Sequence, residues 1–254
     1  MKKVKAAKKK KFFLKKKIFW IFFLSMLVLA SGLYAFLFWE KFQIKEVRMM
    51  GEENELSSSV RSFVEERMGE FSWTGSIFLF NGSLIEEGLG KEFPEIKKIS
   101  VEKTIPDTLN IFIEERKEAA LWNFASEFYS MDEEGIIFRI TEEVENIPVI
   151  LDMEYTGLPC LGDKVIDGEK LAGVLSISRG IEDIGRMELE KMIILNGKRL
   201  NAVMQEGWEV YFNLEEDLAW QITKLKLLMQ EEISLERRET LEYIDLRFEK
   251  AFYK

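Results

Sequence analysis

Residues 99–114, ISVEKTIPDTLNIFIE, have the pattern of a β-hairpin. Apolar residues recur at every second position of both arms: Ile99, Val101, Leu109, Ile111 and Ile113. A period of two places these side chains on one face of each strand. Pro106-Asp107 supplies the turn between the arms. The hairpin therefore predicts a sheet with one apolar face, which other elements must cover.

Two amphipathic helices precede the hairpin. We expect the first over residues 58–68, with Ser58 or Ser59 as its cap and Gly69 at its end. Its apolar side chains share one face: Val60, Phe63, Val64 and Met68. An apolar link over residues 71–80 should pack on the same core.

The second helix is expected to begin with a capping box formed by Ser83 and Glu86 and to end at Pro94. Its inward side chains are predicted to be Leu84, Ile85, Leu89 and Phe93. Upstream of both helices, residues 42–51, FQIKEVRMMG, predict a first strand. The order strand–helix–helix–strand–strand favours a helix pair on one face of a three-stranded sheet.

Residues 18–39, IFWIFFLSMLVLASGLYAFLFW, form an uncharged run of 22 residues. As a helix this run would extend about 33 Å, enough to cross a hydrocarbon core of about 30 Å. Aromatic residues gather at both ends, as in membrane-interface belts. The run continues past the small residues Ala30-Ser31-Gly32, so a membrane anchor is favoured over a cleaved signal peptide.

Charge is divided unevenly along the chain. The formal net charge is -9, yet residues 1–17 contain 10 Lys and no acidic residue, which leaves the remainder at -19. A basic segment beside a membrane helix predicts that residues 1–17 stay in the cytoplasm and that the body is exported. An acidic body would repel phosphate, so we expect no nucleic-acid partner.

Two absences from the sequence exclude whole classes of site. The chain has no His and one Cys, Cys160. Catalytic triads and dyads that use His, His-ligated metal sites and intrachain disulfides are therefore excluded. Cys160 follows Pro159 and is expected to be a small, partly buried side chain. We expect no catalytic residue, no cofactor and no metal.

After Arg116 the pattern changes to short strands with one or two helices. The expected strands cover residues 122–131, 135–141, 192–195, 200–205, 208–213 and 240–248, and the expected helices cover 168–180 and 217–230. A solvated turn over Asp132–Gly135 separates the first two strands. The whole chain is thus predicted to be α+β, with a single transmembrane helix before two folded regions.

Several short motifs occur in a characteristic order and spacing. They are Phe42–Gly51, Pro94–Ile96 with Ile99–Val101, Pro106–Leu109 with Ile111–Ile113, Glu115-Arg116 with Ala119 and Trp122, Met131–Phe138 with its Asp-x-x-Gly turn, Ile147-Pro148, and Tyr243–Phe248. Together, behind one anchor, they resemble the FtsQ/DivIB family of bacterial cell-division proteins. Glu118 departs from the family, which usually has Pro at this point.

The resemblance implies a cytoplasmic tail (residues 1–17), a transmembrane helix (18–39), a POTRA domain (42–117) and a β domain (118–254). It also implies a non-enzymatic scaffold of the divisome in the cytoplasmic membrane at the division site. Such a scaffold binds FtsB/DivIC-like and FtsL-like single-pass proteins and helps to recruit and regulate septal peptidoglycan synthesis. In this family the FtsB partner adds its backbone to the last strand of the β domain.

The predicted last strand, residues 240–248, is C-terminal and is expected to be an open sheet edge. The candidate partner-binding residues are Tyr243, Ile244, Asp245, Leu246, Arg247, Phe248, Phe252 and Tyr253. We expect Ile244, Leu246 and Phe248 to enter the core, which leaves Tyr243 and Arg247 to hold a partner. Asp245 could instead pair with Arg247 as a surface ion pair. Phe252 and Tyr253 either pack back or contact the partner.

Two other classes of protein remain as alternatives. A membrane-anchored cell-wall enzyme is suggested only by Ser100–Lys103, a Ser-x-x-Lys match without its companion motifs. Another POTRA-bearing envelope component, for assembly or secretion, would normally join POTRA repeats to a barrel, and no run of lipid-facing strands is predicted here.

Overall fold

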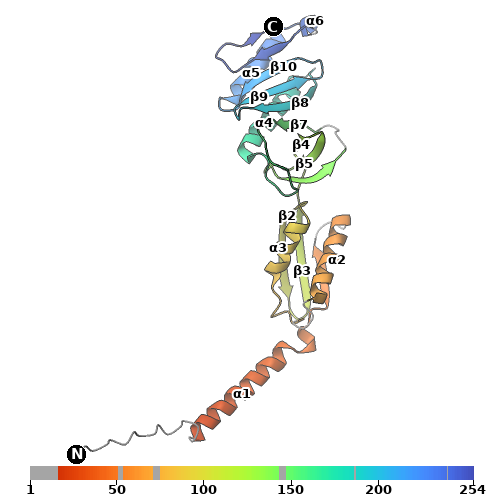
Figure 1. Cartoon of the computed structure of the whole chain (residues 1–254), viewed down its shortest axis with the longest axis vertical. Helices are drawn as coiled ribbons and strands as arrows, with labels where there is room; N and C mark the ends of the chain where they lie inside the picture. The colour runs from red at the N-terminus through yellow and green to blue at the C-terminus, as the bar shows by residue number, and fades with distance from the viewer. Residues whose placement is uncertain (1–16, 51–53, 71–74, 143–146, 186, 239) are drawn as a thin grey trace, which may run out of the picture. The chain divides into compact units, whose positions relative to one another are not determined.

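The computed structural model describes residues 17–254 apart from 51–53, 71–74, 143–146, 186 and 239. Figure 1 shows its helices and strands in chain order. They form two compact units. The first comprises the chain up to Leu89 with Ile99–Ile113, and the second comprises Gly90–Lys98 with Glu114–Lys254. Each unit combines helices with a sheet, which confirms the α+β class.

The apolar run forms α1 (Lys17–Leu37), and a single 3₁₀ turn follows at Glu40–Phe42. Within the part of the chain that the structure describes, α1 is the one helix long and apolar enough to cross a membrane, and none of its residues is buried. A helix with apolar side chains on every side suits a lipid environment rather than a protein core. This feature fits a single-pass membrane protein.

The first unit contains a three-stranded sheet made of β1 (Glu46–Met50), β2 (Ile96–Thr104) and β3 (Thr108–Glu115), in the order β1-β3-β2. The predicted hairpin is confirmed, and β1 runs parallel to β3 with Val47 opposite Leu109. The first strand is shorter than predicted, since Phe42 belongs to the 3₁₀ turn. The buried apolar residues of this unit are Val60, Val64, Ile77, Ile85, Leu89, Leu109 and Ile111.

Helix α2 (Glu55–Glu70) begins earlier than predicted because its cap is Asn54. The Asn54 side chain accepts a hydrogen bond from the Ser57 N–H at 2.9 Å, and Ser57 Oγ accepts one from the Asn54 N–H at 2.9 Å. The predicted caps Ser58 and Ser59 lie inside the helix instead, where their hydroxyls donate to carbonyls one turn back.

Helix α3 (Gly82–Glu92) also differs at its start. The side chain of Asn81 accepts from the Ser83 N–H at 3.2 Å, so Ser83 is not the cap. Glu86 does not complete a capping box, because its carboxylate accepts from the Val101 N–H of β2 at 2.9 Å. Ile85 and Leu89 are buried as predicted, but Leu84 is 54% exposed.

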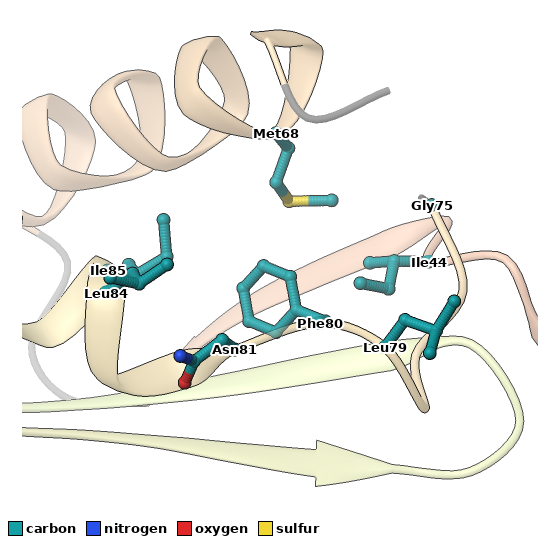
Figure 2. A pocket seen from close by; sticks show the side chains of 8 residues that line it. All are labelled: Ile44, Met68, Gly75, Leu79, Phe80, Asn81, Leu84 and Ile85. Atoms are coloured by element: carbon teal, nitrogen blue, oxygen red, sulfur yellow. The ribbon is translucent and has the colours of Figure 1, made fainter. Parts of the chain in front are cut away.

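The link predicted to pack on the core does so over Ser76 and Ile77, both of which are buried. Its first part, residues 71–74, lies outside the described residues. In Figure 2, Met68 points from α2 toward the ring of Phe80, between Ile85 on α3 and Ile44. These side chains line a small pocket of about 110 Å³ in the first unit.

The second unit contains a nine-stranded sheet, drawn in green to blue in Figure 1, in the order β12-β11-β10-β9-β8-β7-β4-β5-β6. Its strands are β4 (Ala120–Phe124), β5 (Glu127–Met131), β6 (Ile137–Thr141), β7 (Val149–Asp152), β8 (Leu189–Leu195), β9 (Arg199–Met204), β10 (Glu209–Asn213), β11 (Tyr243–Asp245) and β12 (Phe252–Tyr253). The predicted meander of β8, β9 and β10 is confirmed as antiparallel.

Helices α4 (Gly168–Ile184) and α5 (Leu218–Leu227) supply apolar side chains to the core beside this sheet. Asp167 and Asp217 cap them by accepting hydrogen bonds from backbone N–H groups of the first turn. A π-helical turn (Leu228–Glu232) follows α5, and the short helix α6 (Leu235–Arg238) was not predicted.

The predicted strand 122–131 is in fact a hairpin. Its turn is Ala125-Ser126, with φ values of 50° and 70°. Such turns usually contain Asn or Gly, so the sequence lacks the usual signal. Strand β7 was also missed, because four residues between parallel neighbours show no alternation.

The turn at Asp132–Gly135 is solvated as predicted at Glu133 and Glu134, which are exposed, but not at Asp132. Asp132 is 1% exposed, and its carboxylate accepts from the N–H groups of Glu134 and Ile136 and from the guanidinium of Arg116. Two of the sequence motifs therefore meet within the second unit. Cys160 also differs from expectation, since it is exposed.

Candidate protein-binding site

The C-terminal end of the nine-stranded sheet is formed by β10, β11 and β12. β11 pairs in parallel with β10, placing Val210 opposite Ile244, and in antiparallel fashion with β12, placing Ile244 opposite Tyr253. The expectation that residues 240–248 form an open edge is therefore wrong. The chain turns back after Leu246, and its last residues cover β11. Within the described residues, β12 ends the sheet and has no strand on its outer side.

Backbone hydrogen bonds attach β12 only over a few residues. The carbonyl of Lys254 accepts from the Glu242 N–H at 2.6 Å, and the Lys254 N–H donates to the Tyr243 carbonyl at 3.2 Å. The Lys254 ammonium also lies 2.8 Å from the Glu242 carboxylate, in an exposed ion pair that solvent screens. Lys254 therefore helps to hold β12 against β11 through both its backbone and its side chain.

As predicted, Ile244 of β11 and Leu246 just after this strand are fully buried, in the same core as Leu225 of α5. Phe248 was expected to join them and does not, because the strand has ended and the chain bends after Leu246. It is 55% exposed, and its ring lies 6.0 Å from the ring of Phe252. Phe252 is 56% exposed. The two rings form an exposed apolar pair beside the sheet edge.

Tyr243 and Arg247 are tied to neighbouring strands. The ring of Tyr243 stacks on that of Tyr211 with centroids 5.5 Å apart. The guanidinium of Arg199 lies 4.1 Å from the Tyr211 ring centroid, and that of Arg247 lies 5.6 Å from it. The sequence did not reveal the roles of Tyr211 and Arg199. Tyr211 alternates with buried residues in β10, but Arg199 has no such signal, because every later residue of β9 is buried. Tyr243 and Arg247 are half-buried.

The ion pair considered for Asp245 and Arg247 is present. Arg247 Nε and Nη2 donate to the two carboxylate oxygens of Asp245 at 2.8 and 2.6 Å. Burial works to raise the pKa of Asp245, but hydrogen bonds from the Arg247 side chain and backbone N–H outweigh it and hold the pKa below its ordinary value. The hydrogen bond to Asp245 raises the pKa of Arg247. This pair stays ionised and orders the residues after β11.

Lys224 on α5 is a further structural residue that the sequence did not reveal. Its ammonium donates to the carbonyls of Leu246 at 2.7 Å and Phe248 at 2.6 Å. Desolvation by burial lowers the pKa of Lys224. These two bonds hold the chain at the point where it leaves β11 and turns toward β12.

Of the two alternatives left open for the aromatic tail, Tyr253 packs back. Its hydroxyl donates to Glu232 at 3.1 Å, and Arg237 lies 5.0 Å from its ring centroid. Phe252 remains exposed.

Among the described residues, no group of three or more His, Cys, Asp or Glu side chains could hold a metal ion. The arrangement leaves the β12 edge with apolar, cationic and carboxylate groups beside it.

Two known protein families match successive parts of this chain. Residues 42–116 match the family described as "POTRA domain, FtsQ-type", and residues 120–247 match "Cell division protein FtsQ/DivIB, C-terminal". The cell division protein FtsQ of Rickettsia bellii (strain RML369-C) is 25% identical over 126 residues, which cover 50% of this chain and 44% of that protein.

The extracytoplasmic domain of the cell-division protein DivIB from Geobacillus stearothermophilus is 14% identical, with a TM-score of 0.30, over 46% of this chain and 95% of that one. The two family matches together cover most of the chain. This chain belongs to the FtsQ/DivIB family of bacterial cell-division proteins.

Proposed function

We propose that this protein is a non-enzymatic scaffold of the division machinery, and that it captures an FtsB/DivIC-like partner by strand addition at β12. The observation that carries the proposal is the outer side of β12, which has no strand beside it among the described residues. An incoming extended segment could use the free main-chain groups of this edge for affinity. An FtsL-like protein would join through that partner, and the complex would help to recruit and regulate septal peptidoglycan synthesis.

The side chains around β12 suit such a role. Phe248 and Phe252 offer exposed apolar surface, and aromatic side chains are enriched among residues that dominate binding energy. Tyr243 and Arg247 lie next to this surface through the Tyr211 stack and the contact of Arg247 with the Phe248 ring. Ile244, Asp245 and Leu246 act by holding β11 in place, because all three are buried.

The test compares two exposed apolar residues at opposite edges of the same sheet. Phe252 of β12 is 56% exposed and Ile140 of β6 is 54% exposed, so a Glu at either position should leave folding intact. The full chain, purified in detergent, is titrated with tagged FtsB/DivIC-like and FtsL-like proteins from the same organism. We expect Phe252→Glu to weaken capture by about tenfold or more and Ile140→Glu to leave it unchanged. Equal affinities for both variants would contradict the proposed site.

We further propose that the two units face outward from the cytoplasmic membrane and that the Lys-rich residues 1–17 remain inside. Cys160, which is exposed and the only Cys of the chain, reports this orientation. A membrane-impermeant maleimide should label it in spheroplasts without lysis. Labelling only after lysis would reverse the orientation. The other POTRA-bearing envelope proteins would give uniform envelope staining, whereas a division scaffold should give rings at mid-cell.

A further inference from the structure

The turn Ser76–Phe80 is attached to the first residues that follow α1. The Ile77 N–H donates to the carbonyl of Phe42 at 2.8 Å, and the Ile44 N–H donates to the carbonyl of Gly75 at 2.8 Å. The turn itself is closed by N–H groups of Leu79 and Phe80, which donate to the Ser76 carbonyl. Its position is therefore set by Phe42 and Ile44, wherever these residues lie relative to the membrane.

Phe42 cannot lie far from the end of the apolar run. Trp39 ends that run, and residues Glu40–Phe42 form a 3₁₀ turn with a rise of about 2 Å per residue. Phe42 is thus about 6 Å beyond Trp39 along the chain. The polar layer on each side of a bilayer is about 5–8 Å thick. Phe42, and the turn bonded to it, should therefore lie within or beside the headgroup layer.

An aromatic cluster joins the membrane helix to this turn. It consists of Phe36 on α1, Phe42 after it and Phe78 in the turn. The ring centroids lie 5.0 Å apart for Phe36 and Phe42, 5.1 Å for Phe42 and Phe78, and 5.4 Å for Phe36 and Phe78. Apolar contact thus continues without a break from the spanning helix to the turn.

The turn leaves apolar side chains outside the core of the first unit. Phe78 is 37% exposed and Leu79 is 44% exposed, whereas Phe80 points into the pocket toward Met68 (Figure 2). In the same view Leu79 lies beside Ile44 at one end of the pocket, and Leu84 lies at the other end. Phe78 and Leu79 thus keep part of their apolar surface exposed, in addition to their contacts within this unit.

A cationic group accompanies the turn. The ammonium of Lys103 donates to the Phe80 carbonyl at 2.6 Å, and Lys103 is otherwise exposed. Aromatic and Lys side chains together are typical of segments at the membrane surface, where rings sit among headgroups and ammonium groups attract anionic phosphates.

We propose that Phe78 and Leu79 form a second membrane contact, in which the turn Ser76–Phe80 inserts into the headgroup layer at the C-terminal end of α1. The occupant of this surface is the lipid bilayer, because the surface continues the one that α1 already presents to lipid. The contact would restrain the first unit close to the membrane, independently of any partner at β12.

The test uses the full chain with Cys160→Ser, reconstituted in vesicles of phosphatidylcholine and phosphatidylglycerol. Leu79→Cys and, as a matched control, Leu84→Cys each receive a polarity-sensitive fluorophore. We expect the probe at position 79 to emit at shorter wavelength and to be quenched about twofold or more strongly by headgroup-attached nitroxide lipid than the probe at 84. Adding Phe78→Asp to the Leu79→Cys chain should reduce that difference.

Equal quenching at the two positions would overturn the proposal. Protection of position 79 that arises only when FtsB/DivIC-like and FtsL-like proteins are added would overturn it in favour of a protein contact. Circular dichroism of each labelled chain verifies that it is folded. Because the readout needs no partner, failure here leaves strand addition at β12 intact, and failure of partner capture leaves the membrane contact intact.

Discussion

The two edges of the nine-stranded sheet, β6 and β12, are finished in different ways. Outside β6, the chain returns over residues 160–166 and uses its outward backbone groups: the Ile137 N–H donates to Asp163 at 3.0 Å, and the Ile137 carbonyl accepts from Gly162 at 2.7 Å. The rest of β6 carries Arg139, and charge discourages pairing with another strand. β12 has two residues and no such cover among the described residues.

β6 is therefore an edge that the chain itself partly covers, whereas β12 is an edge that another chain could pair with. The covering segment occupies the N–H and the carbonyl of Ile137, which could otherwise pair with another chain. β12 is attached by few bonds and presents its outer side. Both β6 and β12 lie at an edge of the sheet, so their position alone does not show which can accept another strand. What covers each strand does.

The largest expected loss of stability concerns residues 160–166, the segment that covers β6. Gly135 has a φ of 82°, and a Cβ at this position would lie 1.9 Å from the carbonyl oxygen of Ile166, which is backbone and cannot easily move. Gly135→Ala should therefore lower the free energy of unfolding by about 3 kcal/mol or more. Thermal denaturation followed by circular dichroism measures it.

The matched control for this variant is Gly162→Ala in the same covering segment. Gly162 has a φ of 95°, but a Cβ there meets no atom within 4 Å. It should cost only the backbone strain, about 1–2 kcal/mol. Similar losses for both variants would mean that the close approach of Ile166 does not hold the covered edge.

The next prediction distinguishes a partner that adds to the outer side of β12 from a partner that displaces β12 and pairs with β11. Deleting residues 249–254 removes β12 and exposes β11. If the partner adds to the outer side of β12, capture should fall by about 30-fold or more, an amount equal to about 2 kcal/mol. Ile244 and Leu246 remain in the core, so the second unit should stay folded, but the melting temperature should fall because Tyr253 and Ala251 no longer pack against the core. Retained or stronger capture by the shortened chain would show that the partner pairs with β11 and displaces β12.

The smallest effect tests how the open edge is held in place. Lys224→Met removes the ammonium that binds the carbonyls of Leu246 and Phe248. Hydrogen bonds to charged groups contribute about 1.5–3 kcal/mol, so we expect a loss near 1.5 kcal/mol, because the Met side chain preserves packing. Lys226→Met, an exposed position on the same helix, is the control. Urea denaturation of both variants measures the difference, and equal midpoints would exclude this role for Lys224.

Much of the fold could be predicted from periodic patterns. The apolar run, the hairpin at 96–115, the meander of β8 to β10 and the helices α4 and α5 each carry their own signal within a few residues. The starts of α2 and α3 were predicted wrongly because several neighbouring polar residues could cap each helix. Asn54 caps where Ser58 or Ser59 was expected, and Glu86 binds Val101 instead of the start of its own helix.

The candidate site was predicted in part. The aromatic tail, the Asp245–Arg247 pair and the burial of Ile244 and Leu246 follow from the alternation of residues. The length of β11 and the exposure of Phe248 do not, because they depend on the reversal of the chain that Lys224 holds from 22 residues away. Tyr211 and Arg199 lie in other strands, so only strand pairing brings them to this edge.

By itself, the sequence determined the membrane helix, the basic N-terminal segment, the α+β composition and the family, because each depends on composition or on motifs in order along the chain. Only the tertiary structure decided which strand is the open edge. Whether a strand is covered depends on where distant segments return: residues 160–166 return to β6, and residues 252–254 return to β11. Such returns are set by long-range backbone hydrogen bonds, and these leave no periodic signal in either partner.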